Sequence, residues 1–365
     1  MSGKNDTIAA IATPPGTGGV AIVRISGQEA ERVLRRAFRR GDKKTEWKSH
    51  EFVYGHIVRG EETVDEGMAV LMRAPRSYTR EDVAELHCHG GETVTRMTLE
   101  AALEAGARPA QPGEFTRRAF ENGRVDLAQA EAVMRLIGAQ GEAAARQARR
   151  QMDGTVSRGV EKARAQLLAM LAEIAACTDF PDEIEEAPTA EKLLGEARAL
   201  SGALRAACDP RGARVLETGL NVVIAGRPNV GKSSLLNALL GEERAIVTSE
   251  AGTTRDAVRG AMELAGVRVN LTDTAGLREA DSEAEKIGVR RAKEAVANAD
   301  LVLVVLDASQ KLTEEDRETL AETEGVKRWI LLNKTDLPAA EGLPQAETTI
   351  SAQTGEGVDA LREKL

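Results

Sequence analysis

The C-terminal part of the chain alternates short apolar runs with polar, glycine-containing segments. LNVVIA (220–225), VRVNLTD (267–273), DLVLVVLDAS (300–309) and RWILLNKTD (328–336) are rich in leucine and β-branched residues, and helical patterns separate them. Buried strands that alternate with helices are typical of a parallel sheet with helices on both faces. We therefore predict an α/β domain with a doubly wound sheet in this part of the chain.

The first two thirds of the chain have other patterns. VAIVRIS (20–26) has the β-branched character of a strand, whereas EAERVLRRAFRR (29–40) has a helical period. From about Arg124 the sequence becomes rich in Ala, Gln, Glu and Arg, which indicates helices, and DPRG (209–212) has the composition of a linker. The predicted multidomain fold comprises an α+β domain over 1–122, a helical domain over 123–213 and the α/β domain over 214–365.

Composition narrows the class of protein. The chain has 365 residues of which 42% are hydrophobic, enough for two or three cores. We expect no membrane association and a cytoplasmic location, because the sequence contains neither an 18-residue apolar run nor a signal-peptide pattern. The net charge of −9 argues against tight binding to nucleic acid without sequence preference. Three widely spaced cysteines form neither a disulfide framework nor a metal-binding spacing.

A phosphate-binding motif follows the first apolar run of the α/β domain. GRPNVGKS (226–233) matches the pattern GxxxxGK[ST] and stands between a predicted strand and a predicted helix. Glycines permit the loop its close approach to phosphate, and backbone N–H groups at the start of the helix attract the anion. We expect Lys232 to reach the β- and γ-phosphates and Ser233 to bind Mg²⁺.

Two further segments have the character of nucleotide switches. DTAG (273–276) ends a predicted strand, so that Asp273 is expected in the Mg²⁺ shell and the Gly276 N–H at the γ-phosphate. VTSEAGTTRD (247–256) is polar and contains glycine, as a mobile loop requires, and Thr253 or Thr254 would complete the Mg²⁺ shell. The alternative is a solvated hairpin loop.

The choice of base is indicated by NKTD (333–336), again at the end of a strand. The Asp336 carboxylate can accept hydrogen bonds from N1 and N2 of guanine, which adenine cannot donate, and the Ala352 N–H is expected at guanine O6. GTP is therefore favoured over ATP. The expected nucleotide-binding residues are Asn229, Val230, Gly231, Lys232, Ser233, Ser234, Thr248, Ser249, Glu250, Ala251, Gly252, Thr253, Thr254, Asp273, Thr274, Ala275, Gly276, Asn333, Lys334, Asp336, Ser351 and Ala352.

These motifs occur together with characteristic upstream stretches. They are ATPPGTGGVAIVRISG (12–27), SYTREDVAELHCHGG (77–91) and RPAQPGEFTRRAFENGRVDLAQAEAV (108–133). The combination resembles the tRNA modification GTPases of the MnmE (TrmE) family over nearly the whole chain. The resemblance implies a homodimeric GTP hydrolase that, with the flavoprotein MnmG, adds a (carboxymethyl)aminomethyl group to C5 of the tRNA wobble uridine from a tetrahydrofolate one-carbon donor.

The resemblance also implies how hydrolysis proceeds without the glutamine that many GTPases carry where this chain has Leu277. In the family a K⁺ ion stabilises the transition state and a glutamate orients the attacking water. Spacing alone leaves Glu279, Glu283 and Glu285 equally eligible, and the resemblance selects Glu285. The implied ligands are Asn229, Thr248, Glu250 and Thr253 for K⁺ and Ser233 and Thr254 for Mg²⁺.

The N-terminal domain is expected to bind the folate through Arg24, Glu85 and Arg124, where the family often has lysine in place of Arg124. His87, Cys88 and His89 could suggest a metal, but a structural strand is favoured. Because the family continues past the position of Leu365 with helices that complete the middle domain and a Cys-Ile-Gly-Lys end, an incomplete helical domain with exposed apolar residues is expected. The alternative function is a GTPase switch for ribosome or rRNA assembly without one-carbon chemistry.

Overall fold

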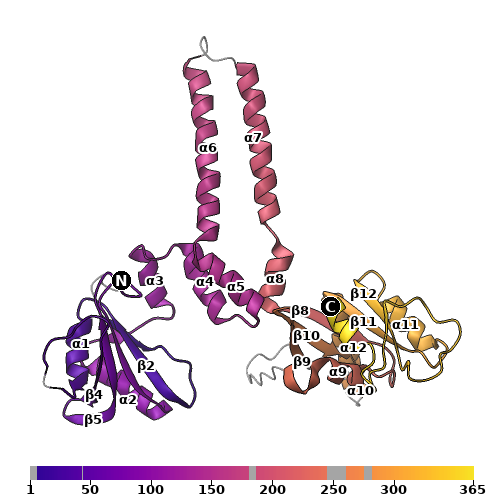
Figure 1. Cartoon of the computed structure of the whole chain (residues 1–365), viewed down its shortest axis with the longest axis horizontal. Helices are drawn as coiled ribbons and strands as arrows, with labels where there is room; N and C mark the ends of the chain where they lie inside the picture. Colours follow the sequence, from indigo (N-terminus) through magenta and orange to yellow (C-terminus); the bar gives the residue numbers. More distant parts are fainter. Residues whose placement is uncertain (1–5, 43, 181–185, 245–259, 275–281) are drawn as a thin grey trace. The chain divides into compact units, whose positions relative to one another are not determined.

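The computed structural model describes residues 6–42, 44–180, 186–244, 260–274 and 282–365, with the backbone alone for 186–188, 242–244 and 282–289. The chain forms two compact units. The N-terminal unit comprises Met1–Ala132 and Met152–Ser157, and the C-terminal unit comprises Val133–Gln151 and Arg158–Leu365. Figure 1 shows the order of the elements in each unit.

A seven-stranded sheet of order β3-β4-β5-β6-β2-β1-β7 forms the N-terminal unit. Its strands pair in antiparallel fashion except for β1 and β7, which are parallel. The elements are β1 (Ile8–Ile11), β2 (Gly18–Ser26), α1 (Ala30–Ala37), β3 (Phe38–Arg40), β4 (Phe52–Arg59), β5 (Glu62–Met72), β6 (Val83–Gly90), α2 (Glu92–Glu104), β7 (Arg108–Pro109) and α3 (Glu114–Glu121). The predicted α+β class is confirmed.

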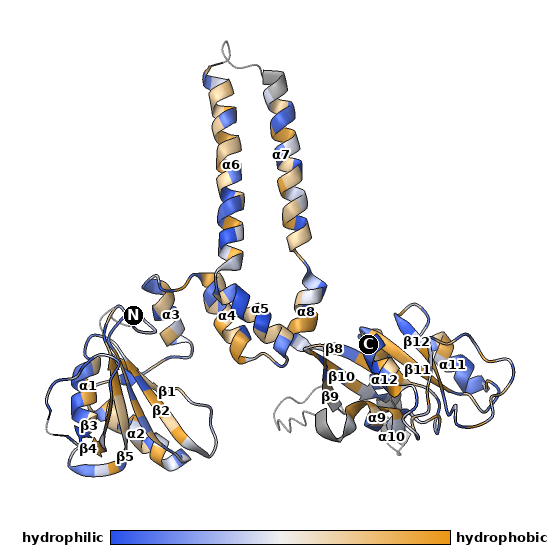
Figure 2. Cartoon of the chain, viewed as in Figure 1, coloured by the Kyte–Doolittle hydropathy of each residue, from blue (hydrophilic) through white to orange (hydrophobic). Residues whose placement is uncertain are grey.

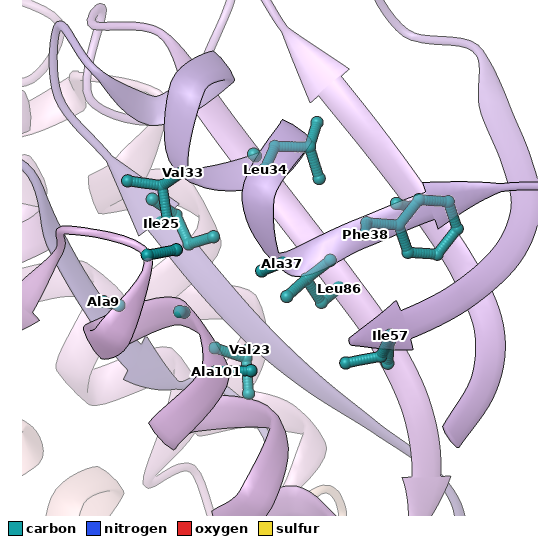
Figure 3. Close-up of a cluster of buried hydrophobic side chains, with 14 of the residues drawn as sticks. Ala9, Val23, Ile25, Val33, Leu34, Ala37, Phe38, Ile57, Leu86 and Ala101 are labelled. Carbon is teal, nitrogen blue, oxygen red and sulfur yellow. The ribbon is translucent and has the colours of Figure 1, made fainter. Parts of the chain in front are cut away.

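The alternation of buried and exposed side chains along the strands determines which face of this sheet the helices cover. Val23 and Ile25 of β2 and Leu86 of β6 are fully buried against Leu34 of α1 and Ala101 of α2 (Figure 3). The residues between them in sequence point to the other face of the sheet, because successive side chains of a strand alternate. Arg24 and Glu85, which the family resemblance implies as folate contacts, pair in the register of β2 and β6 and share that other face.

Five helices follow: α4 (Leu127–Ile137), α5 (Glu142–Met152), α6 (Thr155–Asp179), α7 (Glu186–Ala207) and α8 (Pro210–Thr218). The DPRG segment begins α8, since the Asp209 side chain accepts a hydrogen bond from the Gly212 N–H (2.9 Å) and Pro210 stands at the first helical position. The residues whose composition indicated a linker therefore form the N-terminal cap and first turn of α8. The domain boundary expected after residue 213 falls within α8 and stays a prediction.

Apolar residues recur along the helices of this segment (Figure 2), and several of their side chains are exposed, as the sequence analysis expects. Met134 and Ile137 of α4 are 66% and 75% exposed, and Leu171 of α6 is 59% exposed. Patches of this kind mark surfaces that another chain segment or a partner covers. Within the described ranges, no helix combines the length and the apolar character needed to span a bilayer.

The C-terminal unit ends in a six-stranded sheet of order β13-β12-β11-β8-β10-β9. All its pairs are parallel except β10 with β9, which form an antiparallel hairpin at the edge. The elements are β8 (Leu220–Ala225), α9 (Lys232–Arg244), β9 (Gly260–Leu264), β10 (Val267–Asp273), α10 (Ser282–Ala297), β11 (Leu301–Asp307), α11 (Glu314–Glu322), β12 (Arg328–Asn333), β13 (Thr348–Thr349) and α12 (Val358–Lys364).

Helices cover both faces of this sheet. One core packs Leu235 and Leu239 of α9 and Leu361 of α12 against β8 and β10. On the opposite face, Val302 and Val304 of β11 belong to a second core, which includes side chains from α10 and α11. Every residue of β11 is buried, as expected of a central parallel strand. The predicted doubly wound α/β domain is confirmed.

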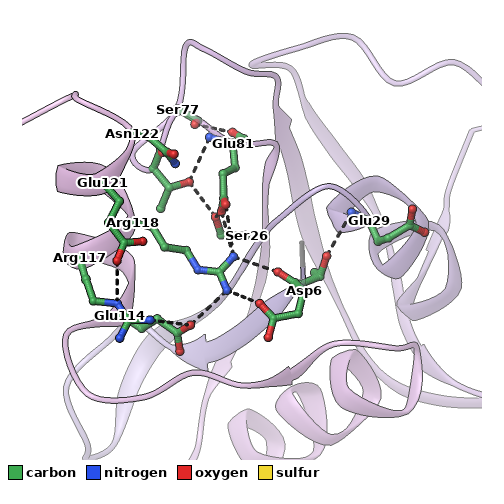
Figure 4. Close-up of polar contacts among 12 residues, drawn as sticks. Asp6, Ser26, Glu29, Ser77, Glu81, Glu114, Arg117, Arg118, Glu121 and Asn122 are labelled. Carbon is green, nitrogen blue, oxygen red and sulfur yellow. Dashed lines mark hydrogen bonds and ion pairs between the residues drawn. The ribbon is translucent and has the colours of Figure 1, made fainter. Parts of the chain in front are cut away.

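An ion-pair network joins α3 to the sheet in the N-terminal unit (Figure 4). Arg118, with 8% of its side chain exposed, donates to Asp6 Oδ1 at 2.6 Å and to Glu114 Oε1 at 3.1 Å, and lies 3.2 Å from Glu81 Oε2. Arg108 donates to the same Glu114 oxygen at 2.6 Å. The hydrogen bond from Arg108 is the largest cause that lowers the pKa of Glu114 from 4.5 to about 2.

This network predicts acid sensitivity of the N-terminal unit. Because the folded-state pKa of Glu114 lies below its unfolded value, its stabilisation is complete above pH 4.5 and is lost as the pH falls towards 2. The shift corresponds to about 3 kcal/mol of unfolding free energy. We expect Glu114→Gln to lower the free energy of unfolding at neutral pH. The variant should also lose less of this free energy than the wild type as the pH falls from 4.5 to 2.

Urea unfolding in a Trp329→Phe background measures this, since Trp47 is then the only tryptophan. Glu121→Gln on the exposed side of α3 is the matched control and should keep the wild-type pH dependence. Equal pH dependence in Glu114→Gln and the wild type would contradict the assignment.

Candidate functional site

Four parallel strands of the C-terminal unit end at one edge of the sheet. Asp273 pairs with Ile224 in the register of β10 and β8, and Asp307 pairs with Asn333 in the register of β11 and β12. The segment 226–233 follows β8 at the same edge. Ligands of open α/β sheets bind at the carboxyl ends of the strands, so these registers bring the sequence motifs to one site.

The phosphate loop has the backbone geometry that its sequence predicts. Gly226 (φ 151°), Asn229 (φ 63°) and Gly231 (φ 96°) all have positive φ. A Cβ at Gly231 would lie 2.3 Å from Asn333 Nδ2, so a larger residue cannot stand there. Lys232 Nζ donates to the carbonyl oxygens of Gly226 (2.8 Å) and Arg227 (2.7 Å), which keeps the ammonium at the mouth of the loop.

Two residues expected in the Mg²⁺ shell, one at the start of α9 and one at the end of β10, also meet. Ser233 Oγ, at the start of α9, donates to Asp273 Oδ2 at 2.8 Å, and Asp273 is fully buried. Thr274 Oγ1 donates to the carbonyl of Ile224 at 3.1 Å, which holds the end of β10 against β8. A hydroxyl and a carboxylate at this distance offer the hard oxygen ligands that Mg²⁺ prefers.

Asn333 connects the phosphate loop to the segments expected to contact the base. Its Nδ2 donates to Val230 O at 2.7 Å, and its Oδ1 accepts from the Ala352 N–H at 2.9 Å. Ser351 Oγ donates to Asp336 Oδ1 at 2.5 Å, which orients the carboxylate expected to accept from guanine. The Ala352 N–H, expected at guanine O6, thus donates to Asn333 in this structure.

Several expected site residues lie outside the described residues. They are Thr248, Ser249, Glu250, Ala251, Gly252, Thr253, Thr254, Ala275 and Gly276, together with Leu277 and Glu279. Glu285 lies in the first turn of α10 by its backbone, and its side chain is outside the description. Ser234 is exposed beside Ser233 on α9.

The N-terminal unit brings the other three expected residues together around Tyr78. Arg24 Nε donates to Glu85 Oε1 at 2.8 Å, and the Arg24 guanidinium lies 5.4 Å from the centre of the Tyr78 ring. The Arg124 guanidinium lies 4.8 Å from the same ring, and Arg124 Nη1 donates to the Tyr78 carbonyl at 3.0 Å. Phe115 lies near Arg24, at 5.9 Å from its guanidinium.

The Glu85 carboxylate has an environment that favours its charge. Its side chain is 12% exposed, and Oε2 lies 3.3 Å from His87 Nε2. The hydrogen bond with His87 is the largest cause that lowers the pKa of Glu85 below its ordinary value; Arg24 adds to it and burial opposes it. Glu85 is therefore an ionised, largely buried acceptor that contacts the Arg24 guanidinium and the His87 ring.

Sequence reasoning missed Tyr78, Phe115 and the role of His87 in this cluster. A signal existed for Tyr78, since it is one of only two tyrosines and stands within the quoted stretch 77–91. Cys88 is buried on the opposite face, and His89 Nδ1 pairs with Asp65 at 2.9 Å. Among the residues that the structure describes, no group of three His, Cys, Asp or Glu side chains is placed to hold a metal ion.

Two family models match the chain, one in each part that holds a candidate site. Residues 7–124 match a family model described as "GTP-binding protein TrmE N-terminus", and residues 221–334 match one described as "50S ribosome-binding GTPase". A solved structure of an Era variant from Aquifex aeolicus, bound to GDP and AlF₄⁻, matches 40% of this chain and 55% of its own with 29% identity and a TM-score of 0.32.

Curated relatives match over almost the full length. The protein named tRNA modification GTPase MnmE from Geobacter metallireducens is 47% identical over 368 residues, which cover 99% of this chain and 80% of the relative. The MnmE of Streptococcus mutans is 47% identical over 373 residues, covering 100% of this chain and 81% of the relative. The nucleotide site described above, the matched N-terminal domain and this similarity together assign the chain to the MnmE family of P-loop GTP hydrolases.

Proposed function

We propose that this chain hydrolyses GTP in the modification of the wobble uridine of tRNA at C5, with a tetrahydrofolate derivative as the one-carbon donor. The observation that carries the proposal is the presence in one chain of two separate sites. A phosphate loop and base loops joined by Asn333 occupy the C-terminal unit, and the Arg24, Glu85, Tyr78 and Arg124 cluster occupies the N-terminal unit. The proposed domains are 1–122 for folate, 123–213 for the helices and 214–365 for GTP.

The two sites offer the same acceptor chemistry to similar rings. Guanine and the pterin ring of folate share a 2-amino-4-oxopyrimidine edge with two adjacent N–H donors. A carboxylate with two oxygens matches such an edge, as Arg pairs with carboxylates elsewhere. We infer that Asp336 accepts from guanine and that Glu85 accepts from the pterin, with Tyr78 against the ring face and Arg24 or Arg124 available to the glutamate tail.

Hydrolysis requires stabilisation of charge that develops on the transferred phosphate. We propose that Ser233 and Thr254 bind Mg²⁺ and that Asn229, Thr248, Glu250 and Thr253 bind K⁺. These cations would supply positive charge beside the β- and γ-phosphates. Lys232 contributes its ammonium from the mouth of the loop, and Glu285 is proposed to orient the attacking water that Leu277 cannot bind.

A second copy of the chain and a flavoprotein of the MnmG type are the proposed partners, with tRNA as the substrate. The uncovered face of the N-terminal sheet supports pairing with a second copy. Phe52, Tyr54 and Met68 are 52%, 57% and 44% exposed on strands β4 and β5. Exposed apolar and aromatic side chains grouped on one face are typical of interfaces.

The alternative is a switch for ribosome assembly that lacks one-carbon chemistry, and the "50S ribosome-binding GTPase" match over 221–334 keeps it open. That match concerns the nucleotide domain, which both functions share. The match of residues 7–124 to the TrmE N-terminus favours the modification function. Binding of folate by the N-terminal unit distinguishes the two.

Replacing K⁺ by Na⁺ is expected to lower the steady-state rate of GTP hydrolysis by about tenfold or more, within the range found for single groups that stabilise transition-state charge. The physical reason is that the smaller ion fits poorly in a shell built for K⁺. Phosphate release is measured at equal ionic strength, with GDP affinity as the control that should not change. Equal rates in the two salts would remove the role proposed for Asn229.

Glu285→Ala is expected to lower kcat by about a hundredfold while the dissociation constant for GTP stays the same, because water orientation acts on the transition state. Glu283→Ala, two residues earlier in the same helix, is the matched control and should hydrolyse GTP at the wild-type rate. A wild-type rate in Glu285→Ala, or a loss confined to Glu283→Ala, would move the role to another residue.

Glu85→Gln is expected to weaken tetrahydrofolate binding by about ten- to a hundredfold, since charge-assisted hydrogen bonds are worth about 1.5–3 kcal/mol. Anaerobic titration calorimetry measures the affinity. Glu66→Gln on the neighbouring strand β5 removes an exposed carboxylate as the matched control. If the wild type binds no tetrahydrofolate, the ribosome-assembly function is favoured; if both variants bind as the wild type does, the folate site lies elsewhere.

A further inference from the structure

Asp307 is a buried carboxylate at the nucleotide edge of the sheet that none of the expected motifs includes. It is the last residue of β11, and 2% of its side chain is exposed. Oδ1 accepts from the N–H (3.0 Å) and the Oγ (2.6 Å) of Ser309, and Oδ2 accepts from Lys334 Nζ at 2.7 Å. Lys334 belongs to the base motif NKTD, so Asp307 binds directly to a residue of the segment expected to contact guanine.

Arg227 approaches the same oxygen from the phosphate loop. Its Nη2 lies 4.0 Å from Asp307 Oδ2 and donates to Gln310 Oε1 at 2.9 Å, while Nε lies 3.2 Å from Asp316 Oδ2. The Arg227 side chain is 15% exposed. Since the carbonyl of Arg227 also accepts from Lys232 Nζ, the guanidinium anchors the segment of the loop that carries the phosphate-binding lysine.

Asp316, the other carboxylate that Arg227 contacts, is itself held by hydrogen bonds at the start of α11. Asp316 Oδ2 accepts from the backbone N–H of Thr313 (3.0 Å) and from its hydroxyl (2.8 Å), and the Asp316 N–H donates back to Thr313 Oγ1 (3.3 Å). This capping box fixes the start of α11. Arg227 therefore lies between a fixed helix terminus and the Asp307 carboxylate.

Lys334 needs such support because its backbone has a φ of 67°. A residue with a Cβ is strained in the left-handed region, and it persists there only when its surroundings hold it. Burial tends to raise the pKa of Asp307, but Lys334 and Ser309 lower it below its ordinary value. The carboxylate thus stays ionised between a cation of the base loop and a cation of the phosphate loop.

We propose that Asp307 is a positioning residue for guanine nucleotide binding, which fixes Lys334 of the base loop and, through Arg227, sets the phosphate loop relative to it. Neither Asp307 nor Arg227 contacts the reacting atoms in this proposal. Loss of the carboxylate should release Lys334 and leave Arg227 with one carboxylate fewer. The nucleotide should then dissociate faster, while the arrangement of Ser233 and Asp273 around the phosphates is retained.

The test is the rate of release of a fluorescent GDP analogue from Asp307→Asn, followed by stopped flow with excess GDP. We expect about tenfold faster release and a KM for GTP raised by a similar factor, with a much smaller change in kcat. Asp300→Asn is the matched control. Asp300 stands at the opposite end of the same strand, where its buried carboxylate pairs with Arg214 and accepts from the Asn221 N–H at 2.9 Å.

A merely structural role would make the two variants alike, because each removes one buried carboxylate at one end of β11. Similar GDP release in Asp300→Asn and Asp307→Asn, or wild-type release in Asp307→Asn, would overturn the proposal. A double-mutant cycle with Lys334→Met adds a second criterion, since the effect of Asp307→Asn should shrink once its partner is gone. Additive effects would also contradict it.

Arg227→Met keeps the proposal testable should Asp307→Asn fail to fold. The methionine retains the apolar stem but loses the cation that faces Asp307 and Asp316. Release of the GDP analogue about threefold faster than in the wild type is expected, in the range for one surface-accessible member of a charge network. An unchanged release rate in this variant would contradict the link between the two loops.

Discussion

The hydrogen bonds of the Asn333 amide are the interaction on which the nucleotide site depends. The amide donates to Val230 in the phosphate loop and accepts from Ala352 in the segment after β13. It is 2% exposed, so both bonds are protected from water. The contact also explains why Gly231 is a glycine, because a Cβ there would collide with this amide. Motifs that lie a hundred residues apart in sequence are therefore parts of one rigid element.

Carboxylates define what each unit of the molecule can bind. Asp336 is oriented by Ser351, and Glu85 is held ionised by His87 and Arg24. In the proposed function, both would accept from a ring edge with two N–H donors, which guanine and pterin have in common. The remaining carboxylates, such as Glu114 and Asp307, are committed to arginines and lysines of the fold. Glu85 also pairs with an arginine, Arg24, so in the proposed function a pterin would share this carboxylate with that side chain.

Much of this arrangement was predictable because it rests on local patterns. The strands of the parallel sheet, the phosphate loop and the ends of β10 and β12 follow from apolar runs and adjacent glycines. The antiparallel edge strand β9 was not predicted. An apolar run in the sequence does not show whether a strand pairs with its neighbour in parallel or in antiparallel fashion. Its direction follows from the two-residue turn of Ala265 (φ 49°) and Gly266 (φ 82°), which is the geometry of a tight hairpin. Asp307 and Tyr78 were missed because their partners are distant in sequence.

Titration calorimetry with GTP and with ATP shows whether the C-terminal unit contains a guanine-specific site. We expect one GTP site per chain and ATP binding weaker by about a hundredfold or more, because the Asp336 carboxylate finds no pair of adjacent N–H donors on adenine. Specificity should reside in Asp336, since the contacts to phosphate are the same for both nucleotides. An affinity for ATP within about threefold of that for GTP would show that the site is not specific for guanine.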